Sequence, residues 1–355
     1  MSSLKYIGMD VHKETISLAV MNSTGKLLME SIIETKASTI LQFFAGLRGN
    51  LRVTFEEGTW AAWLYDLLQA HVTEIVVCNP RKNALLKDGN KSDRVDARKL
   101  ADLLRGNYLK PVYHGEHGLR MLKELSRTYL TVSKDLVRVM NRLKALYRSW
   151  GIAYAGKSVY LRGQREVWLN QIKEAGVRRR AEYLYQQLDT LLPLRKEVRR
   201  ELLSESRKHR ATEILRDIPT IGSIRSAHLV ALIQTPHRFR SKRQLWAYSG
   251  LALETHDSAQ YRYVDGQLLH SRKPQQLHGL NQDHNHDLKG IFKGAAHKAV
   301  SSPGPFHEFY ERLLAKGTKP SLARLTLARK IATTTLTVWK KGVRFDPEQL
   351  KSQAA

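Results

Sequence analysis

Four carboxylates in the N-terminal third of the chain have the types and spacing that metal-dependent phosphoryl transfer needs. Asp10 ends the apolar run YIGMD, and Glu56 ends the run VTFE. Asp93 and Asp96 stand three positions apart in KSDRVDARKL, which places them on the same face of one helix. Carboxylate oxygens suit Mg²⁺ and Mn²⁺, and bound cations can activate an attacking oxygen and stabilise a leaving one. If the fold brings the four acids together, they form a Mg²⁺ (or Mn²⁺) site.

Each acid also has a structural interpretation. An Asp at a strand end is often a turn residue, and Asp93 together with Ser92 could cap a helix. Glu57 competes with Glu56, but neighbouring residues of a strand point to opposite faces, so only one of the two should face the site. The metal interpretation therefore depends on the four acids acting as a set.

Short apolar runs predict the elements that would position these acids. Strands are expected at residues 4–9, 15–21, 27–33, 51–56 and 74–79, and helices near 38–48, 59–70 and from Ser92 onward. This element order is that of an RNase H-like (RuvC-like) α/β domain. The first strand of such a sheet is central, and its carboxyl end faces the closing helix, so the four acids can converge.

A helical region is expected next. From residue 122 to 150 the apolar positions alternate steps of three and four, the spacing of a coiled coil. A weaker seam over residues 177–202 contains Pro193, which favours a kink, and has Arg195 where an apolar residue is due. The two helices could form an antiparallel hairpin within one chain or an interface between two chains.

The remaining chain predicts a mostly helical domain. Helices are expected near residues 211–217, 223–234, 241–248, 289–300, 304–316 and 320–340. The polar segment from Gly250 to Leu288 is expected to be a long loop or a small β-ribbon. The expected organisation is an α/β domain over residues 1–110, a coiled-coil and linker region over 111–210, and a C-terminal domain over 211–345.

The segment IPTIGSIRSAHLVALI, residues 218–233, has the character of a helix-hairpin-helix motif. Backbone N–H groups at such a turn bind phosphate without reading base sequence. Gly222, Ser223 and Arg225 are therefore candidate nucleic-acid contacts. An ordinary helical hairpin without a ligand is the alternative.

Two serines of the polar segment, Ser249 and Ser258, are candidate nucleophiles, and Arg262 is a candidate nucleic-acid contact. Neither serine lies in a G-x-S-x-G elbow, which argues against an α/β-hydrolase. Four histidines fit no zinc spacing, and contact with RNA or phosphate is preferred for them: His270, His278, His284 and His286. The chain has no Walker P-loop and no G-x-G-x-x-G motif, so neither ATP nor a dinucleotide is expected.

The charge balance predicts a polyanionic partner. The chain has 59 Lys and Arg against 33 Asp and Glu, a formal net charge of +26. Residues 1–110 hold 15 against 12, so almost all of the excess lies in residues 111–355, which are expected to bind phosphate backbones. The single cysteine, Cys78, excludes a disulfide framework within the chain and zinc sites with paired cysteines. With no apolar run of membrane-spanning length and no signal peptide, a cytoplasmic protein without a membrane partner is expected.

These motifs together resemble the transposases of the 110-type insertion-sequence family. The resemblance covers nearly the whole chain and rests on YIGMDVHKETISLAV, FEEGTWAAWLYDLL, KSDRVDARKLADLLR, LRDIPTIGSIRSAHLVALI and RQLWAYSGL. It implies a RuvC-like domain with a D-E-D-D carboxylate set, a coiled coil, and a C-terminal transposase domain with a nucleophilic serine, in that order.

The resemblance assigns the carboxylate set to Asp10, Glu56, Asp93 and Asp96. Family members often read Glu-Ala-Thr-Gly-Thr-Tyr where this chain has the shorter EEGTW, so the choice of Glu56 over its neighbour rests on strand phase. The family serine follows the Gly-Leu pair after R-Q-x-x-A at a spacing that reaches Ser258 rather than Ser249. Downstream, GLNQDHNHDLK replaces a Lys-Arg-Gly-Asn-like patch that many members carry.

The resemblance also implies partners and a reaction. Members are recombinases guided by a noncoding (bridge) RNA from their own element, whose loops pair with donor and target double-stranded DNA. Attack by the serine on a DNA phosphate would give a phosphoserine ester, which needs no ATP. The implied protein is a homo-oligomer, a dimer or tetramer, that acts on the bacterial nucleoid.

Two other functions remain open at this point. A RuvC-like junction resolvase would cut by metal-activated water and would leave the serine segment without a role. A non-catalytic nucleic-acid-binding or architectural protein would use the acids only as caps, and it predicts no metal-dependent cleavage.

Overall fold

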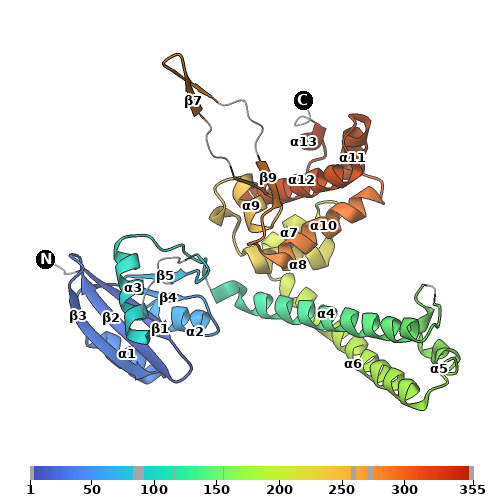
Figure 1. The fold of residues 1–355 in the computed structure, drawn as a ribbon, viewed down its shortest axis with the longest axis horizontal. Coiled ribbons are helices and arrows are strands. Elements are labelled where there is room, and N and C mark those ends of the chain that lie inside the picture. Colours follow the sequence, from blue (N-terminus) through green and yellow to red (C-terminus); the bar gives the residue numbers. More distant parts are fainter. Residues whose placement is uncertain are drawn as a thin grey trace. The chain divides into compact units, whose positions relative to one another are not determined.

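The computed structural model describes residues 4–82, 92–115, 117–154, 156–256, 261–270 and 276–351. The chain divides into two compact units, Met1–Gly115 and Glu116–Ala355, each with its own hydrophobic core (Figure 1). In the part of the chain so described, no helix is both long enough and apolar enough to cross a membrane.

The N-terminal unit is built on one mixed sheet. Its strands are β1 (Leu4–Val11), β2 (Thr15–Asn22), β3 (Leu27–Glu34), β4 (Asn50–Glu56) and β5 (Glu74–Cys78). Their order is β3-β2-β1-β4-β5, with β1 in the centre, antiparallel to β2 and parallel to β4. This mixed α/β arrangement agrees with the expected RNase H-like domain, and it puts the carboxyl ends of β1 and β4 side by side.

Helices cover both faces of this sheet. On one face, α1 (Ala37–Ala45) and α2 (Ala61–Leu68) bury Ile40, Phe44, Leu64 and Leu68 against the odd-numbered residues of β1 and β4. On the other face, α3 (Asp93–Arg105) packs on β1 and β2 through Ala97, Leu100, Ala101 and Leu104. Asp93 and Asp96, the two predicted acids of this helix, lie in its first turn.

Two long helices open the second unit. These are α4 (Arg120–Ser149) and α6 (Ala175–Ser206), which lie side by side in one chain and are joined at one end by a segment containing the short helix α5 (Arg165–Leu169) (Figure 1). Of the two arrangements left open by the sequence, the structure shows the hairpin within one chain. Helix α6 runs through Pro193.

The apolar positions predicted for the two helices account for this packing. Leu136, Val139 and Leu143 of α4 are buried against Leu184 and Leu188 of α6. Trp150, expected at the end of the seam, is instead half exposed.

Arg195 reaches across the hairpin. Its guanidinium donates hydrogen bonds to the Tyr129 hydroxyl at 3.0 Å and to the Ser133 hydroxyl at 3.1 Å. A cation that is hydrogen-bonded in this way can replace an apolar residue in the seam.

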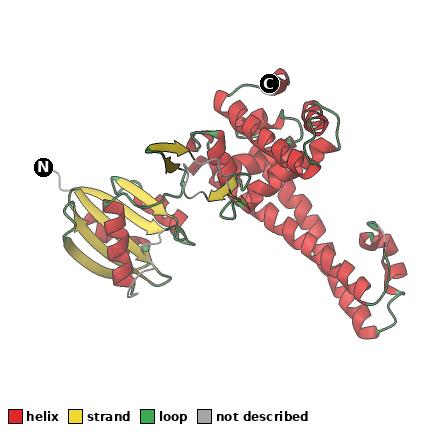
Figure 2. Ribbon diagram, turned by 45° about the horizontal axis from the view of Figure 1, so that its top comes forward, coloured by secondary structure: helices red, strands yellow, loops and turns green. Residues whose placement is uncertain are grey.

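The rest of this unit is a helical bundle with a projecting ribbon. Its helices are α7 (Arg210–Arg216), α8 (Gly222–Ile233), α9 (Lys242–Tyr248), α10 (His286–Val300), α11 (Pro305–Ala315), α12 (Pro320–Lys341) and α13 (Glu348–Lys351). Between α9 and α10 lie two antiparallel pairs, β6 (Leu253–His256) with β9 (Gln276–Leu280), and β7 (Tyr261–Val264) with β8 (Gln267–His270). Figure 2 shows these strands in yellow beside the red helices. The ribbon alternative predicted for this segment is therefore the one observed.

Candidate active site

The register of the sheet places Asp10 and Glu56 at neighbouring strand ends. Met9 of β1 pairs with Phe55 of β4, and Asp10 and Glu56 follow directly on the two parallel strands. Since side chains alternate along a strand, Asp10 lies on the same face of the sheet as Gly8, which packs against α3. Both acids therefore stand on the α3 side of the sheet.

Gly8 sets how closely α3 approaches β1. A Cβ atom at this position would overlap the carbonyl oxygen of Ala97, and it would lie 2.5 Å from the amide nitrogen of Ala101. Only a residue without a side chain allows the helix backbone to lie directly on the strand. This close approach brings the first turn of α3 to the end of β1.

Helix α3 is capped by Ser92 and not by its acids. The Ser92 hydroxyl accepts a hydrogen bond from the Val95 amide at 3.3 Å, and the Asp96 amide donates to the Ser92 carbonyl at 2.9 Å. The carboxylates of Asp93 and Asp96 are thus not used as the N-cap. The predicted cap at Ser92 is therefore confirmed, and both acids lie in the first turn of α3, where their carboxylates are not consumed by the cap.

Three side chains meet at this end of the sheet. His12 Nε2 lies 3.1 Å from Asp10 Oδ2 and 3.5 Å from Asp93 Oδ1. One ligand atom from each of the three residues lies within 4.8 Å of the others, which is close enough for all three to bind one metal ion. His12 is not among the residues predicted from the sequence, although the D-x-H spacing puts it two residues beyond Asp10, on the same side of an extended strand.

Asp96 acts on Asp10 through its charge, although the three residues whose ligand atoms converge are Asp10, His12 and Asp93. Burial raises the pKa of Asp10; His12 opposes this rise through its charge and hydrogen bond, and repulsion from Asp93 and Asp96 adds to it. Asp96 Oδ1 is buried and has no hydrogen-bond partner among the described residues. Mutual repulsion and an unpartnered carboxylate oxygen are what a divalent cation would relieve, so the residues present fit such an ion.

Glu57, the alternative to Glu56 as a site residue, interacts with His114. Its carboxylate Oε2 accepts a hydrogen bond from His114 Nε2 at 2.6 Å, and the His114 ring stacks on Tyr65 of α2 with centroids 5.1 Å apart. Glu56 is partly buried and pairs with Cys78 in the sheet register.

Residues 218–233, expected to hold two helices and a turn, form a tight turn and one helix, α8, and α7 ends at Arg216 before the segment begins. Thr220 and Gly222 both have left-handed backbone, with φ of 72° and 61°, and Gly222 and Ser223 are exposed. Arg225 turns inward, and its Nη1 donates to the Thr220 carbonyl at 2.7 Å. Gly222 and Ser223 therefore face outward at the turn, and the hydrogen bond from Arg225 stabilises the turn.

Of the two candidate nucleophiles, only Ser249 lies among the described residues. Ser249 is fully buried, and its hydroxyl donates to the Leu245 carbonyl at 2.6 Å, so it is not placed to attack a substrate. Ser258 lies outside the described residues, between β6 and β7. Arg262 belongs to β7, where its backbone pairs with Leu269, and its side chain is outside the description.

Comparison with known proteins gives two family matches, one over the N-terminal part of the chain and one over the C-terminal part. A family model for the DEDD transposase of IS110 elements matches residues 7–150, and a model described as a transposase of the IS116/IS110/IS902 family matches residues 212–311. The chain is 21% identical to a 44.8 kDa protein of insertion element IS116 from Streptomyces clavuligerus, over 92% of each chain. It is 28% identical to the transposase of insertion sequence IS1533 from Leptospira borgpetersenii, over 47% of this chain and 50% of that protein.

The first family model begins within β1 and contains all four predicted acids, and the second contains both serines. A DEDD domain requires a divalent metal, in agreement with the cluster at the end of β1. The chain belongs to the IS110 family of insertion-sequence transposases, enzymes that cut and rejoin DNA.

Proposed function

We propose that this transposase is an RNA-guided recombinase that joins donor and target DNA through a covalent intermediate on Ser258. The observation that carries the proposal is the meeting of Asp10 and Asp93 beside the unpartnered oxygen of Asp96, in a chain of the DEDD transposase family. Asp10, Glu56, Asp93 and Asp96 would hold Mg²⁺ or Mn²⁺. The bound cation would neutralise charge that develops on the phosphate and favour an ionised attacking oxygen.

The chain's own residues would carry the transfer. The Ser258 oxygen forms a bond to phosphorus, one bond from phosphorus to a deoxyribose oxygen breaks, and the serine proton ends on the released hydroxyl group. The phosphoserine ester keeps the free energy of the broken phosphodiester. A deoxyribose hydroxyl of the second DNA then attacks the ester and releases the serine, so no nucleotide cofactor is consumed.

The charge distribution supports a division of roles in which the RNA recognises the DNA sequence and the protein contacts phosphate backbones. Residues 111–355 hold 44 Lys and Arg against 21 Asp and Glu, which suits contact with phosphate backbones. Guide pairing would then choose the DNA sites. The exposed turn at Gly222 and Ser223 is a candidate backbone contact. We further propose that the α4–α6 hairpin joins copies of the chain into a dimer or tetramer.

An SDS gel of end-labelled DNA tests the proposal. Donor and target DNA are incubated with the protein, its element-derived RNA and Mg²⁺, and label that migrates with the protein marks the covalent intermediate. We expect the labelled species to vanish in Ser258→Ala and to persist in Ser249→Ala, the matched control. Nicked DNA without protein-linked label, unchanged in both variants, would instead indicate a hydrolytic resolvase.

A further inference from the structure

The free end of the α4–α6 hairpin is strongly basic. Residues 138–182 contain eleven Lys and Arg but only three Asp and Glu. Two nearby acids are already paired with arginines of the same segment: Asp189 accepts two hydrogen bonds of 2.6 Å from Arg165, and Glu182 accepts one of 2.9 Å from Arg179. The remaining cations of the segment therefore exceed what local carboxylates neutralise.

Aromatic rings, not carboxylates, hold two of these cations in place. Lys144 Nζ lies 5.0 Å from the ring centre of Tyr154 and 5.2 Å from that of Tyr160, and the Arg148 guanidinium lies 5.2 Å from the Tyr154 ring. The Tyr160 hydroxyl donates to the Met140 carbonyl at 3.3 Å, which fixes this ring on α4. Contact with a ring orders a cation and leaves its charge available to an external anion.

These cations line an open groove. The groove has a volume of about 640 Å³ and is lined by Asn141, Lys144, Ala145, Arg148, Ser149 and Tyr154. The next residue along the chain, Trp150, is 49% exposed. A cationic groove next to an exposed indole combines the two features that bind an unpaired strand, phosphate neutralisation and base stacking.

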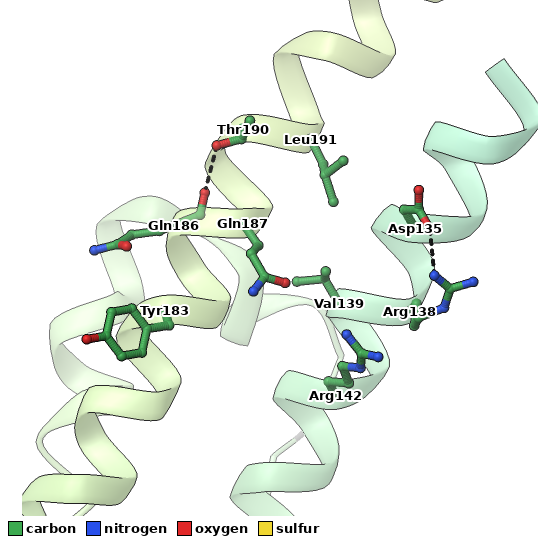
Figure 3. A pocket seen from close by; sticks show the side chains of 9 residues that line it. All are labelled: Asp135, Arg138, Val139, Arg142, Tyr183, Gln186, Gln187, Thr190 and Leu191. Carbon is green, nitrogen blue, oxygen red and sulfur yellow. Dashed lines mark hydrogen bonds and ion pairs between the residues drawn. The ribbon is translucent and has the colours of Figure 1, made fainter. Parts of the chain in front are cut away.

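A second hollow lies between the two helices of the hairpin. It has a volume of about 730 Å³ and is lined by Arg138 and Arg142 of α4 and by Tyr183, Gln186 and Gln187 of α6, among others. Figure 3 shows Arg138 bonded to Asp135, while Arg142 extends beside the space between the helices. Arg142 thus adds a further cation along the hairpin.

We propose that this surface, formed by Arg142, Lys144, Arg148, Trp150 and Tyr154 and here called the hairpin-end surface, binds an unpaired RNA strand. The three cations contact phosphates, and Trp150 stacks on a base. An unpaired strand is favoured over duplex DNA because a duplex keeps its base faces stacked inside and offers Trp150 none. The inference rests on the proposed RNA guidance and adds to it the part of the protein that holds the RNA.

The test measures the affinity of the full-length protein for an unstructured RNA oligonucleotide and for duplex DNA by fluorescence anisotropy at several salt concentrations. In Lys144→Gln/Arg148→Gln we expect about tenfold weaker RNA binding and a log–log salt slope that is shallower by about 1.4, since each single-strand phosphate contact contributes about 0.7. Trp150→Ala should weaken RNA binding by about tenfold with an unchanged salt slope, because stacking releases no counterions. Duplex affinity should not change in either variant.

Lys196→Gln/Arg199→Gln is the matched control, since it removes two exposed cations from α6 outside the hairpin-end surface. Melting temperatures of all variants verify folding. Equal loss of RNA affinity in the control, loss confined to duplex DNA, or no loss at all would overturn the proposal. RNA guidance is tested separately by the labelled protein–DNA adduct. If the adduct forms without RNA while the hairpin-end variants still lose RNA affinity, RNA guidance fails and the RNA-binding surface stands.

Discussion

Asp93 is expected to serve catalysis and not the stability of the fold. Its side chain is 57% exposed at the start of α3, and the N-cap is made by Ser92. We expect Asp93→Asn to lower DNA strand cleavage at least a hundredfold, because a preorganised charge at the reacting phosphate is worth about that much. Cleavage of labelled DNA measures the effect, and an unchanged melting temperature verifies the fold. Full cleavage by the folded variant would remove Asp93 from the metal site.

His12 is expected to tune the metal site. Its ring donates to Asp10 and lies beside Asp93, so it orients the first carboxylate or binds the cation itself. Loss of such a group weakens metal binding by about tenfold or more. We therefore expect His12→Ala to raise the Kd for Mn²⁺ by that factor, measured from the signal of free Mn²⁺ in electron paramagnetic resonance. The exposed neighbour variant Lys13→Ala is the control, and equal Kd values in both variants would contradict the role.

At the scale of elements, the contact of α3 with β1 decides whether the acids meet. We expect Gly8→Ala to destabilise the N-terminal unit by about 3 kcal/mol, because the added methyl group overlaps the α3 backbone and one of the two elements must shift. Thermal unfolding measures the loss. Gly58→Ala, at a position where an added Cβ meets nothing within 4 Å, is the matched control. A Gly8→Ala protein with unchanged stability and Mn²⁺ affinity would show that this contact is not needed.

The sequence predicted elements better than it predicted contacts. Every strand and helix expected in residues 1–110 is present, because each is encoded by the periodicity of its own residues. The hairpin could not be distinguished from an intermolecular pair, since periodicity identifies an apolar face but not the chain that covers it. The same holds for Arg195, whose partners Tyr129 and Ser133 lie on another helix.

The candidate site was likewise predicted in part. Strand alternation indicated that only one of Glu56 and Glu57 should face the site, and helical spacing indicated that Asp93 and Asp96 share a face. The participation of His12 was missed, because one histidine after an aspartate is a weak signal without its spatial neighbours. The pairing of Glu57 with His114 depends on a chain segment that returns beside β5, and no local pattern encodes that return.

At the scale of the whole molecule, stability is expected to depend on pH through a buried histidine of the second unit. His228 of α8 lies 2.7 Å from the Ser126 hydroxyl of α4. Burial lowers the pKa of His228 to about 4, although the charge of Asp287 opposes the shift. The unfolded chain binds a proton here below its ordinary pKa of 6.5, whereas the folded chain does so only below about 4.

The free energy of unfolding should therefore be highest above pH 6.5 and fall by about 3 kcal/mol as the pH drops from 6.5 to 4. Urea unfolding of the full-length protein across this range measures the slope. His228→Gln removes the titration and should flatten that part of the profile, even where its overall stability is lower. A wild-type profile as flat as that of the variant would contradict the assignment.

The boundary at Gly115 has a consequence for the host cell. The acids of the metal site belong to the unit that ends there, and Ser258 belongs to the next one. Under the proposed reaction, breaking a strand uses side chains from both units, so a fragment that holds only one of them would cut no DNA. A host cell that carries only a truncated copy of the gene would therefore keep its DNA uncut by the product.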